Sequence, residues 1–105
     1  MDSIALTEAV FYILLSLDKP LHGYGIMQNA EALSGRRVRL AAGTLYGALG
    51  TLVERRWIKE LKASEGGRKR EYQLTEEGRR VVAAEIVRLR ELLENGERIA
   101  GEWSK

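Results

Sequence analysis

Hydrophobic residues recur at helical spacing in two short segments near the start of the chain. In the first, Thr7 stands ahead of an apolar run and is a suitable helix N-cap, so a helix is expected over residues 4–17. Pro20 interrupts the pattern because proline disfavours helix at the residue before it. The second segment starts at Leu21, and Gly35 is a suitable residue to end it. Two short helices joined by a turn are therefore predicted.

A third helix is predicted from AAGTLYGALGTLVERR, which starts at position 41. Its larger aliphatic residues share one helical face, and these are Leu45, Leu49, Leu52 and Val53. Thr44 and Tyr46 lie off that face, so the helix is expected to have one buried side and one free side. Gly47 and Gly50 are poor helix formers, at roughly 1 kcal/mol each relative to alanine. They either weaken the helix or mark a place where another group approaches closely.

The pattern then changes to the two-residue alternation of β-strands. WIKELKAS (57–64) and REYQLT (70–75) both alternate and are joined through EGG, which predicts a β-hairpin. The turn carries Arg68, Lys69 and Arg70 next to its glycines, although a turn that only reverses the chain needs no such charges. This composition favours contact with a negatively charged partner.

A long helix is predicted to follow the hairpin, with Thr75 as its N-cap and two glutamates in its first turn. Its apolar residues repeat at spacings of four and three, as in a coiled coil. They are Val82, Ile86, Leu89 and Leu93. The repeat weakens at Asn95-Gly96, although Ile99 and Trp103 extend an apolar face beyond it.

Length and composition restrict the class of protein. The chain has 105 residues, of which 45% are hydrophobic and 30% charged, and this suits one globular domain with a small core. A small domain with a long terminal helix often completes its core against a second copy, so dimerisation is expected. The acidic N-terminus and the shortness of the apolar runs predict a protein that is neither secreted nor membrane-embedded, hence cytoplasmic.

Candidate chemistry is sparse. The chain has no cysteine and a single histidine, His22, so we expect no metal site, no cofactor and no enzymatic activity. His22 and Tyr24 are interpreted as structural residues that cap and pack the start of the second helix.

Charge is distributed unevenly although the net charge is only +2. Residues 34–70 contain ten Lys/Arg and three acidic residues, a net charge of +7, and the remainder carries −5. A basic middle between acidic flanks is typical of a face that meets phosphates. The alternative is an ordinary solvated surface of mixed charge.

Three short helices, a hairpin and a long helix occur in the order of a winged helix-turn-helix with an added dimerisation helix, so we predict a mainly α fold with a small β-hairpin. Residues 1–75 would be the DNA-binding domain and 76–105 the dimerisation helix, in one structural unit. Within residues 4–95 the chain resembles the PadR-type transcriptional regulators, named for a phenolic-acid repressor. The segments that carry the resemblance are LHGYGI (21–26), GTLYGAL (43–49) and GGRKREYQLTEEG (66–78).

The resemblance implies a homodimeric DNA-binding protein, usually a repressor, of the compact branch with a single terminal helix. Its recognition helix would span residues 42–55, and its first and last helices would form the dimer interface. The candidate DNA-contacting residues are Arg36, Arg37, Arg39, Ala42, Gly43, Thr44, Tyr46, Gly47, Gly67, Arg68, Lys69 and Arg70. The candidate interface residues are Leu6, Val10, Ile13, Val82, Ile86, Leu89 and Leu93.

Some members of the family sense aromatic small molecules, so the resemblance also implies a small aromatic effector, with Trp103 and Ile99 as candidate ligand-lining residues. The alternative for Trp103 is a terminal ring that covers an apolar patch. The chain departs from the family pattern at Gly50, where Lys or Arg is common, and at Trp57, where glycine is common.

Several assignments keep an alternative. Tyr46 either contacts DNA or packs with its hydroxyl at the rim, and the three arginines at 36, 37 and 39 either contact phosphates or belong to a solvated connector. For the whole chain, the alternative to a DNA-binding repressor is a protein-interaction module on the same scaffold without useful DNA affinity, which Gly50 and the low net charge favour. RNA binding ranks last, because no exposed aromatic platform is predicted.

Overall fold

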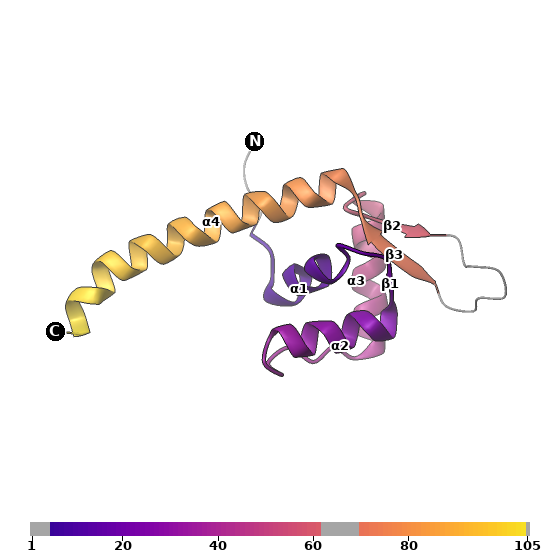
Figure 1. Cartoon of the computed structure of the whole chain (residues 1–105), viewed down its shortest axis with the longest axis horizontal. Helices are drawn as coiled ribbons and strands as arrows, with labels where there is room; N and C mark the ends of the chain where they lie inside the picture. Colours follow the sequence, from indigo (N-terminus) through magenta and orange to yellow (C-terminus); the bar gives the residue numbers. More distant parts are fainter. Residues whose placement is uncertain (1–4, 62–69, 105) are drawn as a thin grey trace.

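The computed structural model describes residues 5–61 and 70–104. Figure 1 shows a cluster of short helices beside a small sheet, from which one long helix extends. The elements are α1 (Glu8–Ser16), β1 (Leu21–His22), α2 (Gly23–Leu33), α3 (Ala42–Glu54), β2 (Ile58–Leu61), β3 (Glu71–Leu74), α4 (Glu76–Ala100) and a final 3-10 turn, η1 (Gly101–Ser104). The predicted mainly α fold with a small sheet is confirmed.

Three helices begin at residues whose side chains accept a hydrogen bond from a backbone N–H of the first turn. Thr7 Oγ1 accepts from Val10 at 3.1 Å, and Thr75 Oγ1 accepts from Gly78 at 3.0 Å. His22 Nδ1 accepts from the Gly25 N–H at 3.1 Å, so the lone histidine is a cap. The predicted capping roles of these residues are confirmed.

Two helices end in the same left-handed turn. After α2, Gly35 has φ 61° and its successor donates to Glu31 O, which confirms the predicted glycine stop. After α3, the equivalent position is Arg56, with φ 65°, and the Trp57 N–H donates to Leu52 O at 3.1 Å. The end of α3 is therefore firmly defined even though a non-glycine residue occupies the left-handed position.

The sheet has three antiparallel strands in the order β1-β3-β2, one more than the sequence predicts. Leu21 and His22, expected to start the second helix, pair instead with Tyr72 and Glu71 of β3. They are extended because His22 caps α2 from outside the helix, which leaves its own backbone in the β region. The start of α2 is thereby attached to the hairpin.

The core lies between α1, α2, α3 and the sheet. Its most deeply buried large side chains are Ile13, Leu14, Leu17, Ile26, Leu45, Leu49 and Ile58. Three of the four predicted core positions of α3 are buried, and Val53, at 36% exposed, lies at the edge. Helical periodicity thus identifies the inward side of α3.

Helix α4 packs on the domain only along its first turns. Gly78, Val82 and Glu85 are buried, whereas the large apolar side chains beyond Glu85 are all exposed, namely Ile86, Val87, Leu89, Leu92, Leu93, Ile99 and Trp103. The helix does not end at Asn95-Gly96 but continues to Ala100 (Figure 1). A long apolar surface on α4 is therefore left uncovered by residues 5–61 and 70–104.

Glu85 holds α4 to the N-terminal segment. Its carboxylate is 2% exposed, receives two hydrogen bonds from Arg88 at 2.7 and 2.8 Å, and accepts the Leu6 N–H at 3.1 Å. The Arg88 guanidinium, assisted by the Leu6 amide, lowers the pKa of Glu85 against the opposing effect of burial.

Glu85→Gln is expected to lower the free energy of unfolding by about 1–3 kcal/mol at pH 7, because charge-assisted hydrogen bonds are lost. The pKa of Glu85 is lower in the folded chain than in the unfolded chain. The ionised carboxylate therefore contributes fully to the free energy of unfolding above the ordinary glutamate pKa, and this contribution is lost as the pH falls through the pKa of the folded state. The stability gap between wild type and variant should therefore narrow at pH 3 in urea denaturation at fixed protein concentration. A gap of equal size at both pH values would contradict this role.

Candidate nucleic-acid interface

The outward side of α3 carries mostly small residues over its first nine positions. Ala42, Gly43, Thr44, Gly47 and Gly50 are all exposed. A Cβ added at Gly43, Gly47 or Gly50 would meet no atom within 4 Å, so nothing in the described chain requires glycine there. These three positions, spaced by four and three, form one strip that we call the glycine face. Another molecule can approach the backbone of α3 closely along it.

Tyr46 borders the glycine face and is half exposed, at 51%. Its ring also lies against the start of α2, because a Cβ at Gly23 would be only 2.3 Å from the Tyr46 hydroxyl oxygen. The packing interpretation of Tyr46 is therefore confirmed, and its contact with DNA stays a prediction. The contact also explains why glycine is needed at position 23.

The same contact connects α3 to the hairpin. Gly23 follows His22, which pairs with Glu71 in the sheet, and Glu71 follows Arg70.

Tyr24, the next residue of α2, adds an exposed aromatic ring beside Gly23, since it is 63% exposed and lies outside the core. The prediction that Tyr24 packs inside the start of α2 is wrong, because its position in the first turn faces solvent.

The three arginines between α2 and α3 have different surroundings. Arg37 pairs with Glu8 at the start of α1, and this hydrogen-bonded pair lowers the pKa of Glu8 and raises that of Arg37. Arg36 and Arg39 instead line a hollow beside α2 together with Tyr24 and Glu31. Arg36 and Arg39 thus lie beside the exposed tyrosine, while the charge of Arg37 is already offset.

The hairpin is described only at its base. Arg70 is 73% exposed along its side chain and pairs with Glu60 across the hairpin at 3.3 Å. Gly67, Arg68 and Lys69 lie outside the described residues. Tyr72 is buried at the base of the hairpin, and this burial, with the nearby Glu60 carboxylate, raises its pKa.

The predicted interface residues fall into two groups. Ile13 and Val82, at 1% and 8% exposed, belong to the core of the single chain, and Leu6 and Val10 pack partly against it. Ile86, Leu89 and Leu93 are 39–60% exposed on α4, and we call these three the apolar seam. Among the predicted interface residues, those of the apolar seam have the largest exposed fractions and are the ones free to meet another molecule.

The four-and-three spacing continues past the apolar seam at Gly96, Ala100 and Trp103. Of these, only Trp103 was predicted from the sequence to extend the apolar face, because the other two residues are small. A hollow on this part of α4 is lined by Leu92, Leu93, Gly96, Glu97, Ala100 and Gly101. Trp103, in η1 just beyond it, is 77% exposed, and Ile99 is 55% exposed. Both candidate ligand-lining residues are therefore accessible.

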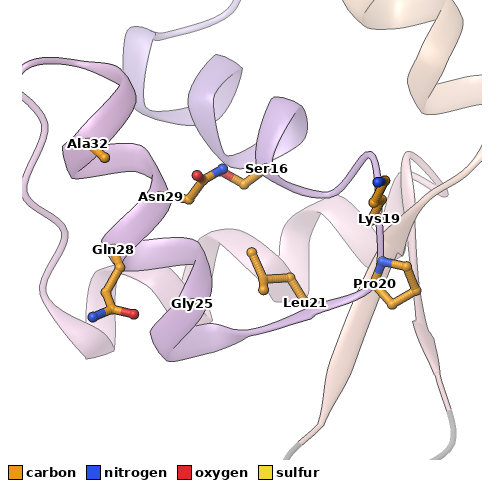
Figure 2. Close-up of a pocket in the computed structure, with 8 residues that line it drawn as sticks. All are labelled: Ser16, Lys19, Pro20, Leu21, Gly25, Gln28, Asn29 and Ala32. Atoms are coloured by element: carbon orange, nitrogen blue, oxygen red, sulfur yellow. The ribbon is translucent and has the colours of Figure 1, made fainter.

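A third hollow, between α1, α2 and the turn before β1, contains none of the predicted site residues (Figure 2). Its central polar groups satisfy one another, since Asn29 Nδ2 donates to Ser16 Oγ at 3.0 Å and Ser16 Oγ donates to Tyr12 O at 2.7 Å. It offers no arrangement that suggests chemistry.

Two kinds of site were also searched for within residues 5–61 and 70–104. No three His, Asp or Glu side chains of this part of the chain are grouped so that they could hold a metal ion. No helix in it is long and apolar enough to cross a membrane.

Comparisons with known proteins identify the family of the chain. Residues 11–84 match the model of the transcriptional regulator PadR-like family. An uncharacterized 37.1 kDa protein in transposon TN4556 of Streptomyces fradiae is 40% identical over 79 residues, which are 74% of this chain and 22% of that protein. The chain thus spans about a fifth of the length of this relative.

Solved structures show the same fold. A PadR family transcription regulator from hypervirulent Clostridium difficile R20291 is 26% identical, with a TM-score of 0.71 over 88% of this chain and 97% of the other. BpsR of Bordetella bronchiseptica, whose DNA binding is regulated by 6-hydroxynicotinic acid, is 17% identical, with a TM-score of 0.68 over 92% of this chain and 69% of its own.

Proposed function

The chain belongs to the PadR-like family of transcriptional regulators, and from this premise we propose that it is a homodimeric, sequence-specific DNA-binding repressor of the cytoplasm. The observation that carries the proposal is the exposed glycine face of α3. Packing within the described chain does not require glycine at its three positions. The face also lies next to the hairpin, through the contact between Tyr46 and Gly23. An α-helix fits the major groove, and a helix without bulky side chains brings its backbone nearer to the base edges.

In this proposal some residues around α3 contact base edges and so read the DNA sequence, and others contact phosphates and so position the protein on the DNA. Thr44 and Tyr46 lie at the start and the border of the exposed side, where they reach base edges or phosphates. Arg36, Arg39 and Arg70 contact phosphates around the groove, together with Arg68 and Lys69 of the hairpin turn. Residues 1–75 therefore read DNA, and residues 76–105 pair two copies.

Pairing is proposed to occur through α4. The apolar seam presents three aliphatic side chains at coiled-coil spacing, and the single chain leaves them 39–60% exposed. A second copy packed on this seam covers them and places two copies of α3 toward half-sites about 34 Å apart, one turn of DNA.

Release by a small aromatic effector is proposed at the end of α4. Trp103 and Ile99 are exposed next to the hollow at Gly96 and Ala100, and flat rings bind such apolar, aromatic places. The regulation of BpsR by 6-hydroxynicotinic acid supports an effector of this chemical class.

A protein-interaction module without useful DNA affinity is the second candidate. It is favoured by the pairing of two candidate phosphate contacts within the chain, Arg37 with Glu8 and Arg70 with Glu60. The two functions differ in the expected response of duplex binding to the hairpin charges.

Reversing the hairpin charges with Arg68→Glu/Lys69→Glu is expected to weaken binding to every duplex at least tenfold, because two phosphate contacts become repulsive. The salt dependence should also fall, by a slope of roughly 4 in log–log form, since the dimer loses two phosphate contacts in each subunit and each contributes about 1. Thr44→Ala or Tyr46→Phe should instead change the preference among sequences. Fluorescence anisotropy on specific and random duplexes measures both effects.

The matched control is Arg80→Glu/Arg98→Glu, which makes the same change of charge at two exposed positions of α4. It should lower affinity much less, through the overall charge alone. Hairpin and control variants that behave alike would contradict a DNA-contacting hairpin.

A further inference from the structure

The start of α4 is joined to the end of α3 through two backbone carbonyl groups. The Thr75 hydroxyl donates to Arg56 O at 2.6 Å and lies 3.0 Å from Trp57 O. The Thr75 N–H donates to Trp57 O, also at 3.0 Å. The residue that caps α4 therefore also holds the turn that ends α3.

Gly78, in the first turn of α4, lies directly against this turn. A Cβ at Gly78 would be 2.0 Å from Trp57 O and 2.7 Å from Leu74 Cδ1, whereas ordinary contact begins at 3.4 Å. The oxygen cannot move aside freely, because Trp57 is held on both sides, by Leu52 through its own N–H and by Thr75 through its carbonyl. Any side chain at position 78 therefore has to displace α4 from the turn that follows α3.

Two further contacts hold α4 within its first ten residues. Arg79 pairs with Asp18 at 2.9 Å, and Glu85 accepts the Leu6 N–H at 3.1 Å. The C-terminal half of α4 has no comparable anchor to the domain among the contacts found in the described part of the chain. The direction of the whole helix is thus set within its first ten residues, where Gly78 and Thr75 contact the turn that follows α3.

We propose that Gly78 is a positioning residue, whose contact with the Trp57 carbonyl sets the angle between α4 and α3 and, through it, the separation of the two recognition helices in the dimer. This inference rests on the proposed dimeric function. The distance between recognition helices must match the spacing of half-sites, so Gly78 determines which spacing the protein accepts without touching DNA. The same joint transmits a change in the pairing of α4 to α3.

The test measures the distance between the two copies of α3 in the free dimer. The chain has no cysteine, so Thr51→Cys, at an exposed position of α3, gives one spin-label site per copy for pulsed electron paramagnetic resonance. Adding Gly78→Ala requires a shift of about 1.4 Å at the contact, from 2.0 to 3.4 Å. Because α4 is roughly 37 Å long at 1.5 Å per residue, a change at its first turn grows along its length. The most populated distance should therefore move by more than about 1.4 Å.

Gly43→Ala is the matched control, because its Cβ enters open space on α3, and it should leave the distance unchanged. Thr75→Val is a second variant that removes the hydroxyl without adding an atom at the contact, and it should broaden the distance distribution. If Gly78→Ala does not fold, Thr75→Val decides the question. A distribution like that of wild type in the folded variants would overturn the role of this joint.

Binding supplies the readout that a purely structural role would not change. On duplexes whose half-sites are moved apart in one-base-pair steps, Gly78→Ala should shift the preferred spacing by at least one step while affinity for a single half-site stays within twofold of wild type. An unshifted preference would overturn the inference and leave the dimeric DNA reader intact. Sedimentation of the wild type as a monomer would overturn the proposed function, and the role of Gly78 with it.

Discussion

Leu89→Glu/Leu93→Glu is expected to convert the protein to a monomer and to weaken binding to its operator by at least about 100-fold, the scale of avidity lost when two linked sites separate. Leu89 and Leu93 are 40% and 60% exposed in the single chain, so carboxylates there stay solvated in the monomer. In the proposed dimer the same carboxylates are buried against each other without partners, which opposes pairing. Sedimentation velocity and fluorescence anisotropy measure the two effects.

Val87→Glu is the control, because Val87 is 61% exposed on α4 but lies outside the apolar seam. It should leave both dimerisation and DNA affinity near those of wild type. Far-ultraviolet circular dichroism should be the same for all variants, since none of these side chains is in the core. A double variant that remains dimeric would show that the copies pair elsewhere or not at all.

Gly47→Ala is expected to change stability and DNA affinity in opposite directions. Alanine at this exposed helical position should raise the free energy of unfolding by about 1 kcal/mol, because its Cβ meets nothing within the described chain. The same methyl group should weaken operator binding about tenfold if α3 approaches the bases closely, which corresponds to about 1.4 kcal/mol. Urea denaturation and anisotropy test the two effects on the same preparation.

Gly43→Ala and Gly50→Ala extend the test along the glycine face. Each should also raise the free energy of unfolding and weaken operator binding. Val87→Ala is the control, since it also improves helix propensity, by roughly 0.5 kcal/mol, at an exposed position of α4 outside the apolar seam. Its DNA affinity should not change. Alanine variants that are more stable and bind DNA as well as wild type would exclude a close approach to α3 and favour the interaction module.

Much of the fold was predictable because its determinants are local. Thr7, Thr75 and Gly35 act within one turn of their own helix, and the buried leucines of α3 follow its period. Strand β1 was not predictable in this way, because two residues form a strand only through pairing with Tyr72 and Glu71, about fifty positions away. The pairing of Arg37 with Glu8 likewise depends on how α1 and α2 pack together.

The candidate site was predicted in part. The free side of α3 followed from periodicity, whereas the same argument could not separate Ile13 and Val82, which the domain uses for its own core, from the apolar seam. Gly50 was interpreted from the sequence as a missing phosphate contact and, with Gly47, as a poor helix former or a mark of close approach. The structure places it on the glycine face with Gly43 and Gly47. Their spacing of four and three was the available indication. The role of Gly78 needs the position of Trp57 O and cannot be derived from sequence.

The most direct test of the proposed function is a fluorescence-anisotropy titration of the wild-type protein against duplexes tiled across the DNA upstream of its own gene, with a random duplex as control, at two salt concentrations. The account predicts that one duplex binds at least about 1,000-fold more tightly than the random control, and that binding weakens steeply as salt increases. Equal weak binding to every duplex, or no binding at the lower salt concentration, would contradict a sequence-specific DNA-binding repressor.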